Sequence, residues 1–379
     1  MHHDPAFGLS EPRAPQRFAR ASALDWREFG LPQRAQLRDL AAHASHPNPF
    51  FEEWHLLPSL EALDPKGEVR LFWLVDDAGR ALGMLPLKRE LAYYGRPLPH
   101  WRNWMHANCF LGTPLVRAGH EAEFWRSLFA WLDTAGAVPM FFHLAGVPLE
   151  TALASTLDDC LSASDRRGRK VHVVERAMLA SPLEPGAYLE DALSTKRRKE
   201  LRRQRRRLGE CGAVTTEFQR DDSDLQSWIA SFLALEAAGW KGEQGSATAD
   251  DPAKAAIFTQ ALLGAAACDK LERRTLRLGG VPIAMLASFR TPPGAFSYKT
   301  AFDEDYARFS PGVLLQLDNL DSLLDPAIDW VDSCASEDHP MIDRMWRERR
   351  RIARYSIGIG GTARQTVFGA LLALEGCTE

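Results

Sequence analysis

A lysine, a run of acidic and aromatic residues and a helix start follow one another between Tyr298 and Gly312, in the sequence YKTAFDEDYARFSPG. Ser310 is typical of an N-cap, and Pro311 suits the first helical position. Gly312 lets another molecule approach the backbone, and the free amides and helix dipole favour a phosphate there. A plain capped helix is the alternative. The residues predicted to bind an anionic cofactor are Arg308, Ser310, Pro311, Gly312 and Val313.

A second group of residues able to bind anions is a basic run. Between Lys196 and Arg207 there are nine Lys or Arg and one Glu, whereas the whole chain has a formal net charge of −4. Ser194 is a suitable N-cap for a helix here, and Leu201 and Leu208 would form its docking face. Cations in the first turn oppose the helix dipole, so we predict an anionic partner, with a solvated helix face as the alternative. The anion-binding candidates are Lys196, Arg197, Arg198 and Arg202.

The elements that position these residues form a repeat. Residues 70–75 and 81–87 predict a β-hairpin, and residues 274–278 and 281–289 predict another around Gly279-Gly280. Amphipathic helices at 121–132 and 311–323 follow, and then strands at 138–144 and 328–333. Two copies of one unit indicate an α/β (α+β) fold with two domains, and the alternative is a chance similarity between two α/β halves.

The two predicted copies differ where chemistry would be done. The first copy offers only Arg117-Ala118-Gly119-His120 at the helix start that corresponds to Ser310-Pro311-Gly312. We therefore place the active site in the second copy, while the first walls the cleft or recognises the acceptor. The predicted organisation is a disordered tail at 1–25, a first domain at 26–178 and a second at 179–379.

Length and composition exclude several classes of protein. The 379 residues are 45% hydrophobic and 25% charged, which is typical of a globular protein of two or three domains. No apolar run reaches the length of a membrane span, and the first 25 residues contain no hydrophobic signal core, so we expect a cytoplasmic protein. The six cysteines form no CxxC pair or Cys/His cluster, so neither a zinc site nor a disulfide framework is predicted.

Three motifs in the second half carry a resemblance to a known family. They are ALEAAGWKG at 234–242, YKTAFDEDYARFSPG at 298–312 and HPMIDRMWRERRR at 339–351. Together they resemble tandem GNAT-type acyltransferases of the CelD-like group, which is connected with cellulose and exopolysaccharide production and related to Fem-type peptidoglycan aminoacyltransferases. The resemblance covers about residues 30–365. It implies two fused GNAT-like domains, each a mixed, largely antiparallel sheet flanked by helices, and acetyl-CoA as acyl donor.

The chain departs from the usual GNAT cofactor signature. That signature is Arg/Gln-x-x-Gly-x-Gly/Ala, whereas this chain reads Arg308-Phe309-Ser310-Pro311-Gly312-Val313. Only the glycine and the helix start remain. Acetyl-CoA is thus implied by the resemblance and by the predicted anion site, without a diagnostic motif.

The resemblance also implies catalytic roles for residues near these motifs. Lys299 lies in the predicted strand, where its charge would stabilise the oxyanion of acyl transfer, and Fem-type relatives have a lysine on a comparable strand. An exposed strand lysine is the alternative. The general-base candidates are Glu236, Asp303, Glu304 and His339. Each of three candidates also has an alternative role. Asp303 would pair with Lys299 or Arg308. Glu236 would be a solvated helix carboxylate, and His339 would be a structural cap.

The preferred catalytic set is Lys299, Glu236 and Asp303, and the substrate-binding candidates are Trp240, Lys241, Tyr298 and His339. The favoured activity is direct transfer of an acetyl group from acetyl-CoA to an amine or hydroxyl of a small or sugar-like acceptor. The basic helix leaves a Fem-like transferase using aminoacyl-tRNA as an alternative. A non-catalytic nucleic-acid or scaffold module is a second alternative.

Overall fold

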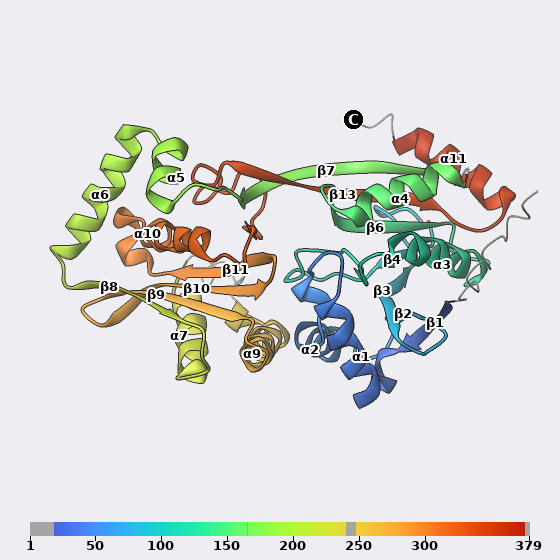
Figure 1. The fold of residues 1–379 in the computed structure, drawn as a ribbon, viewed down its shortest axis with the longest axis horizontal. Helices are drawn as coiled ribbons and strands as arrows, with labels where there is room; N and C mark the ends of the chain where they lie inside the picture. The colour runs from blue at the N-terminus through green and yellow to red at the C-terminus, as the bar shows by residue number, and fades with distance from the viewer. Residues whose placement is uncertain (1–18, 165, 240–247, 376–379) are drawn as a thin grey trace, which may run out of the picture.

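The computed structural model describes residues 19–164, 166–239 and 248–375. A mostly antiparallel sheet of 13 strands runs through both halves, and helices flank it (Figure 1). The strand order is β1-β2-β3-β4-β6-β13-β7-β12-β11-β10-β9-β8, and β5 pairs with β3 outside this path. The predicted mixed α/β architecture is confirmed.

The strands of the first half run from β1 to β7. Its strands are β1 (Arg20–Asp25), β2 (Arg70–Val75), β3 (Ala81–Glu90), β4 (His100–Asn103), β5 (Leu115–Val116), β6 (Phe141–Pro148) and β7 (Gly168–Leu179). Its helices are η1 (Trp26–Glu28), α1 (Leu31–Ala42), η2 (Pro49–Phe51), α2 (Glu53–Leu63), α3 (Glu121–Thr134) and α4 (Ala152–Ala163).

The second half adds the elements that surround the candidate site. Its strands are β8 (Val214–Gln219), β9 (Leu271–Leu278), β10 (Val281–Thr291), β11 (Gly294–Phe302), β12 (Trp330–Asp332) and β13 (Glu348–Gly358). Its helices are α5 (Pro185–Ala192), α6 (Thr195–Gly209), α7 (Leu225–Ala237), η3 (Thr248–Asp250), α9 (Pro252–Ala267), η4 (Glu304–Phe309), α10 (Pro311–Asp318), η5 (Asn319–Leu324) and α11 (Thr362–Glu375).

The internal repeat is present in the topology. The antiparallel pair β2–β3 corresponds to β9–β10, and in each half the next strand pairs in parallel with a later one, β4 with β6 and β11 with β12. A helix, α3 or α10, lies between the two parallel strands in the chain. A parallel pair requires such a crossover, whereas the hairpins need only a short turn.

The two halves exchange their last strands. β7 follows the first half but pairs with β12 of the second, and β13 follows the second half but pairs with β6 of the first. β7 and β13 also pair with each other from Met178–Glu348 to Gly168–Ile357, and Figure 1 shows them crossing between the halves with α11 beside α3 and α4. The predicted second domain, 179–379, is therefore wrong at its end, because β13 belongs to the sheet of the first half.

The predicted tail at 1–25 is also wrong at its end. Arg20–Asp25 form β1, which pairs with β2 along its whole length. Leu24 of this strand packs against the main hydrophobic core, whereas Arg20, Ala21 and Ser22 are exposed. The remaining tail residues, 1–18, lie outside the described part of the chain.

A buried charge cluster closes the seam between the halves. Asp332 of β12 is fully buried and accepts hydrogen bonds from Arg176 Nη2 at 2.7 Å and Arg350 Nη1 at 2.8 Å. Arg350 also contacts His46 Nε2 at 2.7 Å, and burial together with Arg350 lowers the pKa of His46 to about 3. The neutral ring of His46 therefore accepts from Arg350, and the cluster links residues of both halves at the start of the candidate site.

Candidate active site

A cavity opens where the two parallel strands of the second half separate. β11 and β12 pair only from Gly294–Trp330 to Phe296–Asp332. Beyond this pair β11 continues to Phe302, whereas the segment after β12 turns away at Cys334, whose φ is 52°. The space beyond the last pair, called here the β11–β12 cavity, has a volume of about 470 Å³. Its lining consists of Phe110, Ser297–Thr300, Phe302, Gln316, Ser333–Ser336 and His339–Ile342.

A β-bulge in β11 determines which side chains face which layer. Lys299 pairs with Ala287 and Ser297 with Ser288, so Tyr298 is an extra residue in the ladder. Ser297 is hydrogen bonded to Gln316 of α10, whereas the Tyr298 ring stacks on Phe258 of α9 at 6.2 Å. Tyr298 and Lys299 are adjacent in sequence, and because of the bulge both side chains point to the layer of α7 and α9.

Lys299 and Glu236 meet the same threonine. Lys299 Nζ donates to Thr248 Oγ1 at 3.2 Å, and the backbone N–H of Thr248 donates to Glu236 Oε2 at 2.9 Å. Glu236 is 4% exposed, so it is a buried carboxylate and the alternative of a solvated one is wrong. Lys299 is half-buried and lines the cavity, and it is not an exposed strand lysine. The structure thus brings two of the three predicted catalytic residues together.

The start of α10 has a different geometry from the one predicted. Ser310 occupies the N-cap position, but it has a φ of 55° and its side chain makes no capping bond. Its hydroxyl instead accepts from Gln204 Nε2 of α6 at 3.4 Å. Ser310 therefore occupies the predicted N-cap position, but the predicted capping hydrogen bond from its side chain is not formed. Among the described residues, no group accepts from the amides of Gly312 and Val313.

Gly312 lies against the cavity lining. A Cβ atom added to it would lie 3.0 Å from Met341 Sδ and 3.3 Å from Phe302 Cδ1, and both residues line the cavity. Pro311, Gly312 and Val313 are all buried. The predicted helix start therefore borders the β11–β12 cavity, and a larger residue at 312 would compete with the lining for space.

Other predicted site residues lie at or outside the rim. Asp303 accepts from the N–H of Asp305 at 3.0 Å as the N-cap of η4, and it is not in the cavity lining. Arg308 is exposed, with its guanidinium 4.8 Å from the ring of Phe309. His339 lines the cavity, and its carbonyl accepts from the N–H of Ile342 at 3.2 Å. The other two substrate-binding candidates, Trp240 and Lys241, lie outside the described residues.

Sequence reasoning missed most of the lining, including Gln316 and Cys334. Gln316 is 2% exposed and donates from Nε2 to Ser297 Oγ at 3.2 Å; it could have been found as a single amide within the apolar run of α10. Cys334 is buried, and burial together with Asp332 raises the pKa of its thiol well above the ordinary value. The thiol is therefore protonated at neutral pH and is a poor nucleophile.

The basic helix α6 lies next to the start of α10. Ser194 caps it by accepting from the N–H of Arg197 at 3.3 Å, and Leu201 and Leu208 are buried, as predicted. Arg198, predicted to bind an anion, forms an ion pair with Glu190 at 2.7 Å. Among the described residues of α6, the exposed basic side chains with no hydrogen bond or ion pair are Lys196, Arg197, Lys199, Arg202 and Arg207.

None of the helices in the described residues is both long enough and apolar enough to cross a membrane. In the same residues, no three His, Cys, Asp or Glu side chains are grouped so that they could hold a metal ion. The five cysteines in the described ranges are free thiols.

Part of the chain is similar to a known protein family. The family described as acetyltransferase (GNAT) domain matches residues 195–339, which include β11, α10 and β12. No curated protein matches the chain. In solved structures, FemX is similar with a TM-score of 0.53 and 9% identity, covering 85% of this chain and 95% of its own.

Two further structures share the fold over most of their length. A conserved protein of unknown function from Bacteroides thetaiotaomicron VPI-5482 has a TM-score of 0.56 and 11% identity, covering 90% of this chain and 100% of its own. L-PGS from Bacillus licheniformis has a TM-score of 0.50 and 10% identity, covering 86% and 91%. At such identities the likenesses show the fold alone. Residues 195–339 match the GNAT acetyltransferase domain family, and this match supports an acyltransferase.

Proposed function

We propose that this protein transfers an acyl group from acetyl-CoA to an amine or hydroxyl group of a small or sugar-like acceptor. The observation that carries the proposal is the β11–β12 cavity, which lies between diverging parallel strands and borders a helix start whose amides find no acceptor in the described residues. A cavity beside free amides suits a ligand that is apolar at one end and anionic at the other.

The residues present fit such a donor. Phe110, Phe302 and Met341 provide an apolar wall for the arm that carries the thioester. The amides of Gly312 and Val313, at the positive end of α10, suit a pyrophosphate, and Arg308 is exposed close by. Acetyl-CoA supplies the activated acyl group, and the residues of the chain hold it, orient it and exclude water.

Lys299 and Glu236 supply the charge and the base. Lys299 lines the cavity, where its ammonium would stabilise negative charge developing on the thioester oxygen. Glu236 would accept the proton of the attacking amine or hydroxyl, and Thr248 holds both side chains in place. The protonated thiol of Cys334 favours direct attack by the acceptor over an acyl-cysteine intermediate.

The acceptor would reach the cavity from the side of the first half, because Phe110 of that half forms part of the lining. Tyr298 and His339 are the described candidates for acceptor contacts, and Trp240 and Lys241 are further ones. A sugar-like acceptor agrees with the resemblance to the CelD-like group and with a role in exopolysaccharide production. The cytoplasm, where acetyl-CoA is present, is the proposed location.

The experiment that tests this function is turnover of acetyl-CoA with a panel of amines, amino sugars and polyols. Release of free CoA would be followed with a thiol reagent, and the acetylated product identified by mass spectrometry. Acceptor-dependent release with a product heavier by one acetyl group supports the proposal. A protein that binds acetyl-CoA but acetylates no member of the panel narrows the acceptor class, whereas a protein that does not bind it contradicts the donor.

A second candidate function is Fem-like transfer of an aminoacyl group from aminoacyl-tRNA. The observation that favours it is the set of exposed cations on α6 near the start of α10, which suits the phosphates of RNA. Retention of tRNA at low salt, lost steeply as salt rises, supports this donor, and its absence argues for acetyl-CoA. A non-catalytic module, the remaining alternative, disagrees with the acetyltransferase domain match.

A further inference from the structure

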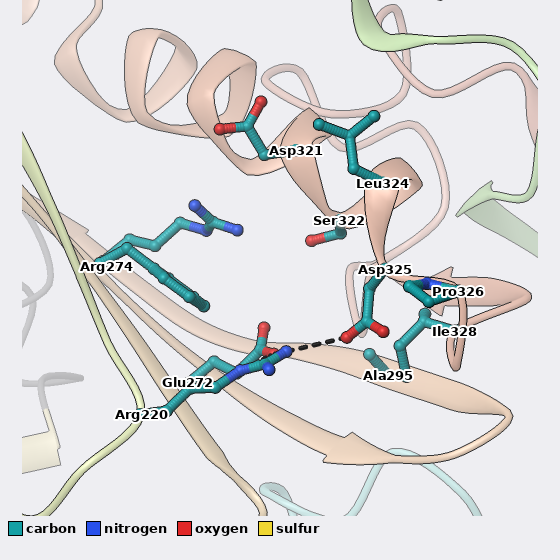
Figure 2. Close-up of a pocket in the computed structure, with 11 residues that line it drawn as sticks. Arg220, Glu272, Arg274, Ala295, Asp321, Ser322, Leu324, Asp325, Pro326 and Ile328 are labelled. Atoms are coloured by element: carbon teal, nitrogen blue, oxygen red, sulfur yellow. Dashed lines mark hydrogen bonds and ion pairs between the residues drawn. The ribbon is translucent and has the colours of Figure 1, made fainter.

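A second cavity lies on the other end of the β11–β12 pair. It has a volume of about 400 Å³ and is enclosed by β8 and β9 below and by η5 and the turn after it above (Figure 2). Its lining is Phe218, Arg220, Glu272, Arg274, Ala295, Asp321, Ser322, Leu324, Asp325, Pro326 and Ile328. None of these residues lines the β11–β12 cavity, so the two spaces are distinct.

One cation in this cavity, Arg274, makes no ion pair with the described residues, although Glu272, Asp318 and Asp321 lie near enough to act on its charge. Arg220 pairs with Glu272 at 2.6 Å and with Asp325 at 2.8 Å, and Arg290 pairs with Asp325 at 2.8 Å, which satisfies both carboxylates. Arg274 is only 7% exposed, and among the described residues its terminal nitrogens make no hydrogen bond or ion pair. Burial lowers the pKa of Arg274, which reflects the cost of holding this charge away from water.

Arg274 is held in a fixed position with its terminal nitrogens available. Its Nε donates to Asn319 Oδ1 at 3.0 Å, and its guanidinium stacks on the ring of Phe218 at 4.3 Å. Asn319 is itself fixed by donating to Gln316 Oε1 at 3.1 Å. Figure 2 shows Arg274 extending from the sheet toward the segment of Asp321 and Ser322. A fixed planar guanidinium is suited to bidentate binding of a carboxylate.

The rest of the lining limits the size and charge of a ligand. Phe218 is 46% exposed and Leu324 is 53% exposed, which is unusual for large apolar residues, and both border this cavity with Pro326 and Ile328. Asp321 on the rim adds a negative charge, so a dianion such as phosphate would be repelled more than a monoanion. The chemistry fits a carboxylate attached to an apolar body.

We propose that this cavity is a binding site for a small organic monocarboxylate, whose carboxylate pairs with the terminal nitrogens of Arg274 and whose apolar body packs between Phe218 and Leu324. The site uses residues that the proposed acyl transfer does not. Its ligand is a separate molecule from the acyl donor, and its existence does not depend on the donor being acetyl-CoA.

The test is calorimetric titration of the whole protein with phenylacetate, and with phenylacetamide as an uncharged ligand of the same shape. We expect saturable binding of phenylacetate and binding of the amide weaker by at least about tenfold, because only the carboxylate pairs with a guanidinium. Arg274→Gln should weaken phenylacetate binding to the same extent. Arg277→Gln, an arginine of the same strand outside this cavity, is the matched control and should bind like wild type.

Phe218→Ala guards against a folding defect in the Arg274 variant, since Phe218 is half-exposed and its loss removes the apolar contact together with the stacking on Arg274. It should bind phenylacetate more weakly while its melting temperature stays near that of wild type. Absence of saturable binding to wild type overturns the proposal. Equal binding of acid and amide, or of wild type and Arg274→Gln, overturns it as well. Titration with acetyl-CoA is a separate measurement, so failure here leaves the donor assignment untouched.

Discussion

Gln316 donates a hydrogen bond from its Nε2 to Ser297 Oγ over 3.2 Å, which joins α10 to β11 within the wall of the β11–β12 cavity. Both side chains are buried, at 2% and 5% exposure, so the bond is shielded from water. The helix whose start borders the cavity and the strand that carries Lys299 are therefore fixed to each other. Catalysis by positioned groups depends on this kind of rigid support.

Replacing Lys299 by methionine should reduce turnover by about 10²–10³-fold, the usual effect of removing one group that stabilises an oxyanion. The methionine keeps the apolar stem, so acetyl-CoA affinity should stay close to that of wild type. The measurement is release of CoA under saturating donor and acceptor, with binding followed by calorimetry. Lys254→Met, which changes a half-buried lysine of α9 that pairs with Asp251, is the matched control. Wild-type turnover in Lys299→Met would contradict the role given to Lys299.

Replacing Glu236 by glutamine separates a base from a structural acceptor. Glutamine keeps an oxygen that can accept from the N–H of Thr248, as Glu236 Oε2 does at 2.9 Å, but it cannot take up a proton. We expect turnover to fall by about 10²-fold with an unchanged melting temperature, because general-base catalysis contributes about 10²–10⁴-fold. Unchanged turnover in Glu236→Gln would show that the carboxylate only supports Thr248.

Much of the second half could be predicted from local sequence. The hairpin around Gly279-Gly280, the helix that begins at Pro311 and the basic helix capped by Ser194 depend on turn residues, caps and periodic apolar residues close in the chain. The motifs predict both Lys299 and Glu236 as catalytic residues, but their common contact with Thr248 joins residues 63 positions apart and could not be predicted.

Features that depend on distant pairing could not be predicted. The exchange of β7 and β13 is decided by which strand edges are available after both halves form, and no local pattern encodes it. The bulge at Tyr298 depends on the register of β10 and β11. Ser310 does not cap α10 because its left-handed backbone and the bond from Gln204 on another helix turn the hydroxyl away.

Asp332 should be a main contributor to the stability of the seam. Asp332→Asn removes the charge that faces Arg176 and Arg350 in a buried site, so the free energy of unfolding should fall by about 3–5 kcal/mol at neutral pH. The measurement is denaturant unfolding. Asp191→Asn, which affects an exposed pair with Arg347, is the control and should change stability by less than about 1 kcal/mol. Equal losses in the two variants would contradict this account.

The same residue predicts a dependence on pH. Burial alone would raise the pKa of Asp332, but Arg176 and Arg350 hold it below its ordinary value. A lowered pKa in the folded state stabilises the protein above the unfolded pKa of about 3.9, and the stabilisation is lost as the pH falls through the folded value. The difference in unfolding free energy between wild type and Asp332→Asn should therefore shrink below about pH 4. A constant difference across that range would argue against an ionised Asp332.

Charge reversal on α6 should reveal its partner. In the triple variant Lys196→Glu, Arg197→Glu and Arg202→Glu, the first two changes place acidic residues in the first turn, where they suit the dipole, and Arg202 is exposed, so α6 should stay folded. If α6 contacts phosphates of the donor, acetyl-CoA affinity should fall by about tenfold, less so at high salt. The triple variant Lys66→Glu, Arg96→Glu and Arg126→Glu on the first half is the control. Unchanged affinity with loss of tRNA retention would favour the aminoacyl-tRNA donor.

The donor site is the central claim, and one comparison of glycines tests it most directly. Pro311-Gly312 begins α10 at the cavity, and Pro185-Gly186 begins α5 with no atom within 4 Å of an added Cβ. Calorimetric titration with acetyl-CoA should show saturable binding to wild type and to Gly186→Leu. Gly312→Leu should bind at least about tenfold more weakly, because its side chain competes with Met341 and Phe302 for the space the donor needs. Equal affinity of Gly312→Leu and wild type, or no binding to wild type, would contradict the assignment.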